Sequence, residues 1–141
     1  MTLRYLLDTC VISEFVKPNP VRQVVDWLNR VDGDLTFLSA VTFGEIQMRI
    51  SQLPPSNRRT ELEVWLAGVL TAQFAGRVLA LDVDTFRIWG QMAAQRKQQG
   101  APMAVMDSLI AATAAQHGMV LVTRHVADFK TTGLPLLNPW A

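Results

Sequence analysis

Short apolar runs alternate along this chain with longer segments whose apolar residues recur every three or four positions. Short runs bounded by turn-forming residues are typical of buried strands, and the longer spacing is typical of amphipathic helices. Strands are expected at residues 3–7, 35–38, 78–81, 120–122 and 136–137. Helices are expected at residues 9–16, 21–31, 40–52, 59–74, 84–99 and 102–117. Because the two kinds of element alternate, the pattern predicts an α/β fold with a parallel sheet covered on both faces.

Capping residues support several of these boundaries. Ser39 is expected to cap the helix that follows it, and Asp84 is expected to cap the helix that ends before Gly100. Gly118 stands where helices commonly end in the left-handed conformation. No linker rich in glycine, serine or proline interrupts the chain, so residues 1–141 are expected to form a single domain.

Acidic residues stand within apolar segments, where an unpaired carboxylate is costly to bury. They are Asp8, Glu45, Asp107 and Asp128. In a parallel sheet the functional cleft lies beyond the carboxyl ends of the strands. Asp8 ends the first strand, and Asp128 closely follows the strand at 120–122. We therefore expect these carboxylates to converge at one edge of the sheet.

Each acid also has a simpler structural explanation. Asp107 lies near a helix start, where the helix macrodipole favours a negative charge. Glu45 could pair with Arg49 one turn later on a solvated helix face. Asp8 could bond its own loop, and Asp128 could cap a turn. Taken singly, these alternatives stay open.

A shared divalent cation accounts for the whole set, because the sequence offers no obvious buried cation for each acid. Grouped carboxylates repel one another, and Mg²⁺ or Mn²⁺, which prefers oxygen ligands, removes that repulsion. Such an ion also binds phosphate oxygen and lowers the pKa of a bound water, which then attacks phosphorus more readily. The acids therefore predict metal-dependent chemistry on phosphate esters.

The segments around these acids extend over nearly the whole chain. In order they are LLDTCVISE (6–14), FGEIQ (43–47), LPPSNRR (53–59), VWL (64–66), MDSLIAATA (106–114), LVTRHVADF (121–129) and LLNPW (136–140). Together they resemble PIN-domain ribonucleases of the VapC toxin family, in the FitB-like subgroup. The resemblance implies a three-layer α/β/α sandwich with a short, mostly parallel five-stranded sheet. It also implies a Mg²⁺- or Mn²⁺-dependent endoribonuclease that hydrolyses RNA, with a cognate antitoxin as its inhibitor and a homodimer as its assembly.

The resemblance also assigns roles to individual residues. Catalytic and metal-binding roles fall on Asp8, Glu45, Asp107 and Asp128. Thr9 and Thr123 are expected to support them. The Thr9 hydroxyl would orient a carboxylate or a water; for Thr9, capping of the helix is the alternative.

Two positions depart from the family's pattern. Its threonine–arginine–asparagine motif reads Thr123-Arg124-His125 here, and Arg49 stands where this subgroup often has glycine. Both arginines are candidates for contact with RNA phosphate. A surface ion pair is the alternative for Arg124, and a narrowed groove is the alternative for Arg49. His125 is expected to be a polar loop residue.

Composition is compatible with this interpretation and adds little to it. The net charge is +1 and the basic residues are scattered, so tight non-specific binding to nucleic acid is not indicated. The single cysteine, Cys10, is expected to be a small buried hydrophobe. No secretory leader and no apolar stretch of about 18 residues are found, so we expect a cytoplasmic protein without membrane contact.

A non-enzymatic alternative stays open from sequence alone. It is a catalytically weak or inactive PIN-like module that binds RNA or an antitoxin and contributes to regulation of its operon. The helices near 46–50 and 62–69 carry more apolar residues than one face requires, notably Met48, Ile50, Trp65 and Leu66. This surplus predicts a homodimer contact or a groove for an antitoxin helix.

Overall fold

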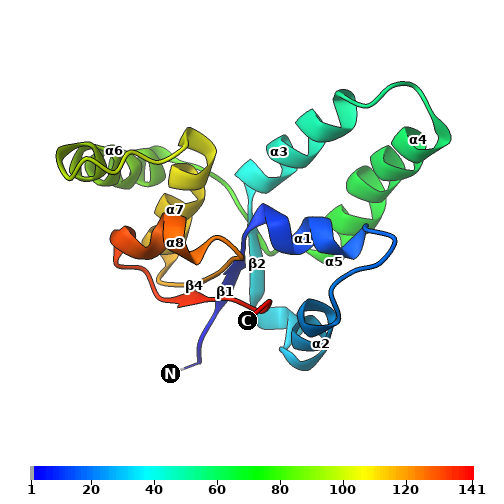
Figure 1. Ribbon diagram of the computed structural model, residues 1–141, viewed down its shortest axis with the longest axis horizontal. Coiled ribbons are helices and arrows are strands. Elements are labelled where there is room, and N and C mark those ends of the chain that lie inside the picture. Colours follow the sequence, from blue (N-terminus) through cyan, green and yellow to red (C-terminus); the bar gives the residue numbers. More distant parts are fainter. Residues whose placement is uncertain (1) are drawn as a thin grey trace.

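The computed structural model describes residues 2–141, whose strands form one parallel sheet in the order β3-β2-β1-β4-β5 (Figure 1). The strands are β1 Tyr5–Leu7, β2 Thr36–Ser39, β3 Val78–Leu79, β4 Val120–Val122 and β5 Leu136–Leu137. All the predicted strands are present. The sheet is parallel at every pairing, as expected for strands joined by helical crossovers.

The predicted helices are present in the predicted order, and a short helix that was not predicted, α8, follows β4. They are α1 Thr9–Phe15, α2 Arg22–Arg30, α3 Ala40–Ser51, α4 Asn57–Val64, α5 Thr71–Gln73, α6 Val83–Gln98, α7 Val105–His117 and α8 Val126–Phe129. Short 3-10 turns occur at η1 Gly33–Leu35 and η3 Lys130–Thr132. The predicted helix at 59–74 is α4 and α5 joined by a π-helical segment, η2 Trp65–Leu70.

Alternation along the strands builds a core on each face of the sheet, because successive side chains point to opposite faces. Leu6 and Leu121 are paired in register and pack with residues of α7 and α8. Leu7 and Val122, the next pair, pack with residues of α1, α2 and α3 on the other face. Helices therefore cover both faces, and the three-layer α/β/α sandwich is confirmed (Figure 1).

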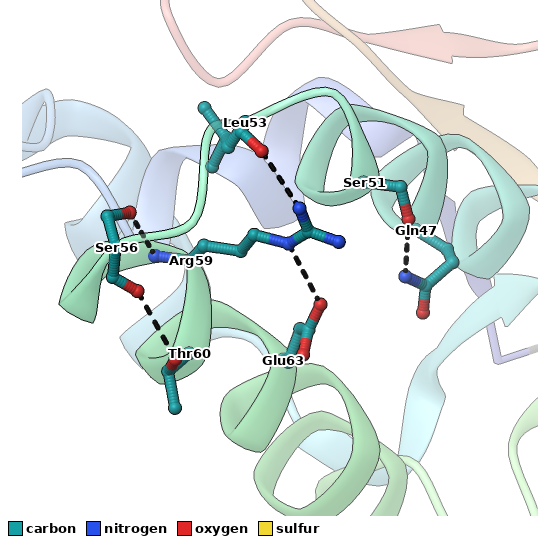
Figure 2. Close-up of polar contacts among 7 residues, drawn as sticks. All are labelled: Gln47, Ser51, Leu53, Ser56, Arg59, Thr60 and Glu63. Atoms are coloured by element: carbon teal, nitrogen blue, oxygen red, sulfur yellow. Dashed lines mark hydrogen bonds and ion pairs between the residues drawn. The ribbon is translucent and has the colours of Figure 1, made fainter.

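Arg59 holds together the hairpin of α3 and α4 (Figure 2). Its Nη1 donates to the Leu53 carbonyl at 3.0 Å, and its Nε donates to Glu63 Oε1 at 3.3 Å. Its backbone N–H donates to Ser56 Oγ at 3.1 Å, so Ser56 caps α4. These contacts tie the loop after α3 to the first turns of α4, which fixes the far end of α3.

The start of α6 was predicted wrongly, because Asp82 and not Asp84 caps this helix. Asp82 Oδ1 accepts from the Thr85 N–H at 3.0 Å, and Thr85 Oγ1 accepts from the Asp82 N–H at 3.0 Å. This reciprocal capping box provides hydrogen-bond acceptors for the backbone N–H groups of both Asp82 and Thr85. Asp84 therefore lies inside the first turn.

Helix α7 begins at Val105 and not at residue 102. Gly100 adopts the left-handed conformation at φ +69°, and the Ala101 N–H donates to the Arg96 carbonyl at 2.9 Å. These features end α6 and send the chain into a turn. The next helix can start only after that turn, so Pro102 lies in the loop. At the other end, Gly118 is left-handed, as predicted.

The predicted apolar surplus is present, but on partly different side chains, because Val64 and Val69 are exposed. Ile50 and Leu66 belong to the core, because they close the face that α3 and η2 turn towards the sheet. Met48 is exposed, and Trp65 is half-buried against the same core. Of the four apolar residues, only these two remain for a protein contact. No helix within residues 2–141 is long and apolar enough to cross a bilayer.

Candidate active site

Asp8 lies where β1 ends beside β4. Its N–H donates to the Val122 carbonyl at 2.9 Å, which continues the pairing of the two strands by one residue. The pairing brings Thr123 alongside, and its hydroxyl donates to Asp8 Oδ2 at 2.7 Å. Asp8 Oδ1 accepts from the Thr9 N–H at 2.7 Å and so caps α1. Asp8 is buried, and these contacts to its carboxylate come from neutral donors.

Thr9 connects α1 to the acid on α3. Its hydroxyl donates to Glu45 Oε1 at 2.6 Å and lies 3.0 Å from the hydroxyl of Thr42, one turn earlier on α3. Thr9 and Thr42 are both buried. Capping of α1 by Thr9 was therefore the wrong alternative, because Asp8 is the cap and Thr9 is the first residue of the helix.

The two remaining acids come from the opposite side of the site. Asp107 lies in the first turn of α7 and is half-buried, and Asp128 lies on α8 and is exposed. Within residues 2–141, neither carboxylate accepts a hydrogen bond or forms an ion pair. The turn-capping role considered for Asp128 is not observed.

All four acids line one cavity of about 500 Å³. Its wall is formed by Asp8, Thr9, Cys10, Glu45, Arg49, Ala104, Val105, Met106, Asp107, His125 and Asp128. A second hollow of about 370 Å³, which shares Asp107 and Asp128, extends from it over residues 101–104. The four acids therefore lie together at the carboxyl edge of the sheet, as predicted.

The charges in this cavity act on one another. The pKa of Asp107 is raised above its usual value, chiefly by burial and then by the negative charges of Asp8, Glu45 and Asp128. The ion pairs found within residues 2–141 involve none of these acids. The pair of Glu45 with Arg49, considered from the sequence, is among those not formed.

This donor set suits a hard cation. It consists of carboxylate and hydroxyl oxygens, which Mg²⁺ and Mn²⁺ prefer. Within the described chain, no group of three or more Asp, Glu, His or Cys side chains is arranged as a ready metal-ligand set. Like-charged carboxylates avoid close approach unless a cation lies between them. The half-buried Asp107 and the exposed Asp128 both border the open space of the cavity.

The arginines predicted to contact RNA lie in different surroundings. Arg49 lines the cavity, is exposed, and donates from Nη1 to Ser13 Oγ at 3.3 Å. Arg124 is exposed, lies outside the cavity wall, and stands 5.6 Å from the ring centre of Trp140. The surface ion pair considered for Arg124 is not found within residues 2–141.

Cys10 and His125 are wall residues that sequence reasoning undervalued. Cys10 Sγ lies 3.7 Å from Asp8 Oδ2, and burial, followed by the Asp8 charge, raises the pKa of its thiol to about 11. The backbone N–H of His125 donates to Thr123 Oγ1 at 3.0 Å. The sequence signal that could have identified them is their position, because Cys10 directly follows Thr9 and His125 comes two residues after Thr123.

Comparison with known proteins agrees with this geometry. The family model of the PIN domain matches residues 5–130. VapC ribonuclease Y4jK of Sinorhizobium fredii is 38% identical over 135 residues, which is 96% of this chain and 96% of that protein. Toxin FitB of Neisseria gonorrhoeae is 35% identical over 135 residues, which is 96% of this chain and 97% of that protein.

Solved structures give the same result. The crystal structure of FitAcB from Neisseria gonorrhoeae is similar at a TM-score of 0.91 and 34% identity, covering 96% of this chain and 98% of that one. Several structures with this fold are complexes, among them a toxin–antitoxin complex from Klebsiella pneumoniae. Nucleases of the PIN-domain VapC type are typically metal-dependent. The chain belongs to the PIN-domain family, among the VapC/FitB-type toxin ribonucleases of toxin–antitoxin systems.

Proposed function

We propose that this protein is a Mg²⁺- or Mn²⁺-dependent endoribonuclease that hydrolyses RNA phosphodiester bonds as the toxin of a toxin–antitoxin pair. One observation carries the proposal. Four carboxylates from four separate helices or strand ends line a single cavity, and within residues 2–141 none of them pairs with a cation. A site with this surplus of negative charge suits a divalent ion and, through it, a phosphate substrate.

The metal-binding and catalytic roles would fall on Asp8, Glu45, Asp107 and Asp128. When bound, the ion supplies positive charge to the phosphodiester and acidifies a water. Asp8 Oδ1 accepts from the Thr9 N–H alone, which leaves a lone pair on that oxygen for a cation, whereas Oδ2 accepts from the Thr123 hydroxyl and from the Cys10 thiol. Glu45 is bonded through Oε1, so Oε2 stays available.

Asp107 and two arginines would have further roles toward the metal and the substrate. Burial and the neighbouring acids raise the pKa of Asp107, so a nearby cation would favour its charged form. The exposed guanidinium of Arg49 is long enough to meet a phosphate at the mouth of the cavity. Arg124, which stacks near Trp140 outside the wall, would contact RNA further along the strand.

We extend the proposal to partners and setting. The antitoxin complexes among the similar structures support a cognate antitoxin for this chain. We propose a homodimer of single-domain chains, residues 1–141, working in the cytoplasm, where RNA substrates are found. The exposed Met48 of α3, and the exposed Val64 and Val69 that flank the half-buried Trp65, offer apolar surface for one of these protein contacts.

The test is cleavage of structured RNA by the purified protein in Mg²⁺, in Mn²⁺ and in EDTA. Wild type should cleave with either ion and not in EDTA. Asp8→Asn and Asp107→Asn should lose at least roughly 100-fold, as expected when a group central to catalysis is removed. Asp84→Asn is the matched control, because Asp84 is an exposed acid outside the cavity wall. Wild-type activity in Asp107→Asn would refute the assignment.

A further inference from the structure

Cationic side chains that are distant in the sequence meet along α1. They are Lys17, two residues beyond the last residue of that helix, Arg49 on α3 and Arg58 on α4. All three are exposed. The sequence shows only scattered basic residues, because the contacts that bring these three together are tertiary. We call Lys17, Arg49 and Arg58 the basic strip.

The two arginines of the strip are bonded to successive points along α1. Arg49 Nη1 donates to Ser13 Oγ at 3.3 Å, and Arg58 Nη2 donates to the Val16 carbonyl at the C-cap. A helix rises about 1.5 Å per residue, so Ser13 lies about 6 Å and Val16 about 10 Å along the axis from Thr9 in the wall of the carboxylate cavity. The strip therefore begins at the cavity and runs away from it.

A buried carboxylate holds Lys17 at the far end of the strip. Glu14 is 1% exposed; its Oε2 lies 2.7 Å from Lys17 Nζ, and its Oε1 accepts from the Val21 N–H at 2.9 Å. The pKa of Glu14 is lowered, first by the Lys17 contact, so the carboxylate is charged at neutral pH. Glu14 lies outside the wall of the carboxylate cavity, and its fixed charge orients Lys17.

The strip presents N–H donors to solvent. Arginine carries five of them, and within residues 2–141 Arg49 uses one and forms no ion pair. Arg58 approaches Glu61 only at 3.9 Å, between side chains that are 52% and 68% exposed, and such a pair contributes little. The Lys17 side chain is 52% exposed. Each cation is thus oriented by α1 and still able to bind an anion.

We propose that the basic strip binds the phosphate backbone of the RNA substrate where the strand leaves the carboxylate cavity along α1. The inference rests on the proposed nuclease function and deepens it, because it gives the path of the strand on one side of the cut. Arg49 belongs both to the cavity wall and to the strip, so the two surfaces are continuous. Contacts to phosphate position a nucleic acid without reading its sequence.

Charge explains why the site needs such a strip. Four carboxylates in the cavity repel a polyanion, and the whole chain has a net charge of only +1. Cations within about 10 Å of the cavity, roughly one Debye length, offset this repulsion locally. An acidic protein segment would meet the same cations. RNA is the favoured occupant, because the strip continues directly from the site proposed to cleave a phosphodiester.

The first experiment measures binding of a fluorescently labelled single-stranded RNA to the metal-free protein in EDTA, by anisotropy, at several KCl concentrations. The slope of log Kd against log salt falls by about 0.7 for each lost phosphate contact, so the triple variant should lower it by about 2. That variant carries Lys17→Gln, Arg49→Gln and Arg58→Gln. The matched control loses the same charge from exposed arginines outside the cavity wall and should keep the wild-type slope; it carries Arg22→Gln, Arg30→Gln and Arg87→Gln.

The second experiment separates binding from chemistry. In Mg²⁺ the triple variant should raise KM for RNA by roughly 10-fold and leave kcat near the wild-type value, because the strip holds substrate and transition state equally. Thermal unfolding checks each variant. Where Lys17→Gln, which leaves Glu14 without its partner, prevents folding, the double variant of Arg49→Gln and Arg58→Gln should still lower the salt slope by about 1.4.

The outcomes separate the two proposals. Equal slopes for the triple variant and its control, or no RNA binding by wild type in EDTA, overturn the strip, while cleavage in Mg²⁺ still tests the nuclease. A loss of kcat with unchanged KM places these residues in the chemical step and overturns their role on the backbone. Weaker antitoxin binding with unchanged RNA affinity assigns the strip to a protein partner and also overturns it. A lowered slope in the triple variant without any cleavage by wild type supports the strip while the nuclease proposal fails.

Discussion

Replacing Thr9 with valine removes the hydroxyl that links α1 to Glu45 while preserving the shape of the side chain. In the structure this hydroxyl donates to Glu45 Oε1 at 2.6 Å and lies 3.0 Å from the Thr42 hydroxyl. Both threonines are buried, so water does not readily replace the lost partner. We expect Thr9→Val to lower stability and to loosen Glu45.

The magnitude follows from the two contacts. A hydrogen bond to a charged group contributes about 1.5–3 kcal/mol, and a neutral one contributes about 0.5–1.5 kcal/mol. The added apolar character of valine offsets part of the loss, so we expect a decrease of about 2–3 kcal/mol in the free energy of unfolding. For 141 residues the entropy of unfolding is about 0.3 kcal/mol per kelvin, which places the drop in Tm at about 7–10 °C.

The assay is urea and thermal unfolding of the metal-free protein, followed by a titration of cleavage rate against Mg²⁺. Thr9→Ser is the control, because it keeps the hydroxyl and should lose only about 1 kcal/mol from the deleted methyl group. The double variant with Thr42→Val should be little worse than Thr9→Val, since both members of that pair are then apolar. A Tm of Thr9→Val within a degree of wild type would refute the role given to this hydroxyl.

Three further predictions concern charged groups. The pKa of Asp107 is raised, so its charged form destabilises the metal-free fold once the pH has risen through that pKa. Asp107→Asn should therefore raise the Tm of the metal-free protein near neutral pH while abolishing cleavage. This gain in Tm over wild type should vanish in acid, where the wild-type carboxyl is also neutral. Glu14 is buried, and its Oε2 lies 2.7 Å from Lys17 Nζ, a contact that is the first cause of its lowered pKa. Lys17→Met should therefore lower the free energy of unfolding by about 1 kcal/mol at pH 7, and by progressively less as the pH falls below 4.5, as measured by urea unfolding. The pKa of the Cys10 thiol is about 11, against an ordinary 9.0, so Cys10 should react with iodoacetamide roughly 100-fold more slowly than a free thiol at pH 7.4, as followed by mass spectrometry. Asp8→Asn should accelerate the reaction, because it removes a charge that raises this pKa. Equal rates in wild type and Asp8→Asn would exclude the Asp8 charge as a cause.

The layout of the fold was readable from the sequence because its signals are local. A three-residue strand such as β4 reads as an unbroken apolar run, and the position of Asp8 directly after β1 follows from the same pattern. Parallel strands place their carboxyl ends together, so the meeting of Asp8 with Thr123 follows from topology. The convergence of the acids was therefore predictable without knowing any side-chain contact.

Features that depend on packing were not predictable in the same way. Asp82 and Asp84 are both suitable caps, and only the reciprocal bond with Thr85 selects Asp82. Thr42 became part of the site because α3 lies against α1, which no local pattern encodes. Arg96 reads as one more helix cation in the sequence, and its burial without a partner emerges only when α6 packs on α7.

The donors that hold the acids explain how the site keeps its charge. Asp8 and Glu45 are bound by hydroxyl and backbone N–H groups, which orient a carboxylate without neutralising it. A buried arginine in place of these donors would stabilise the metal-free protein and compete with a cation for the same oxygens. Arg49, the arginine in the cavity wall, instead donates to Ser13. Burial, followed by the repulsion that remains, raises the pKa of Asp107, so the fold retains an unfavourable interaction that a divalent cation would relieve on binding.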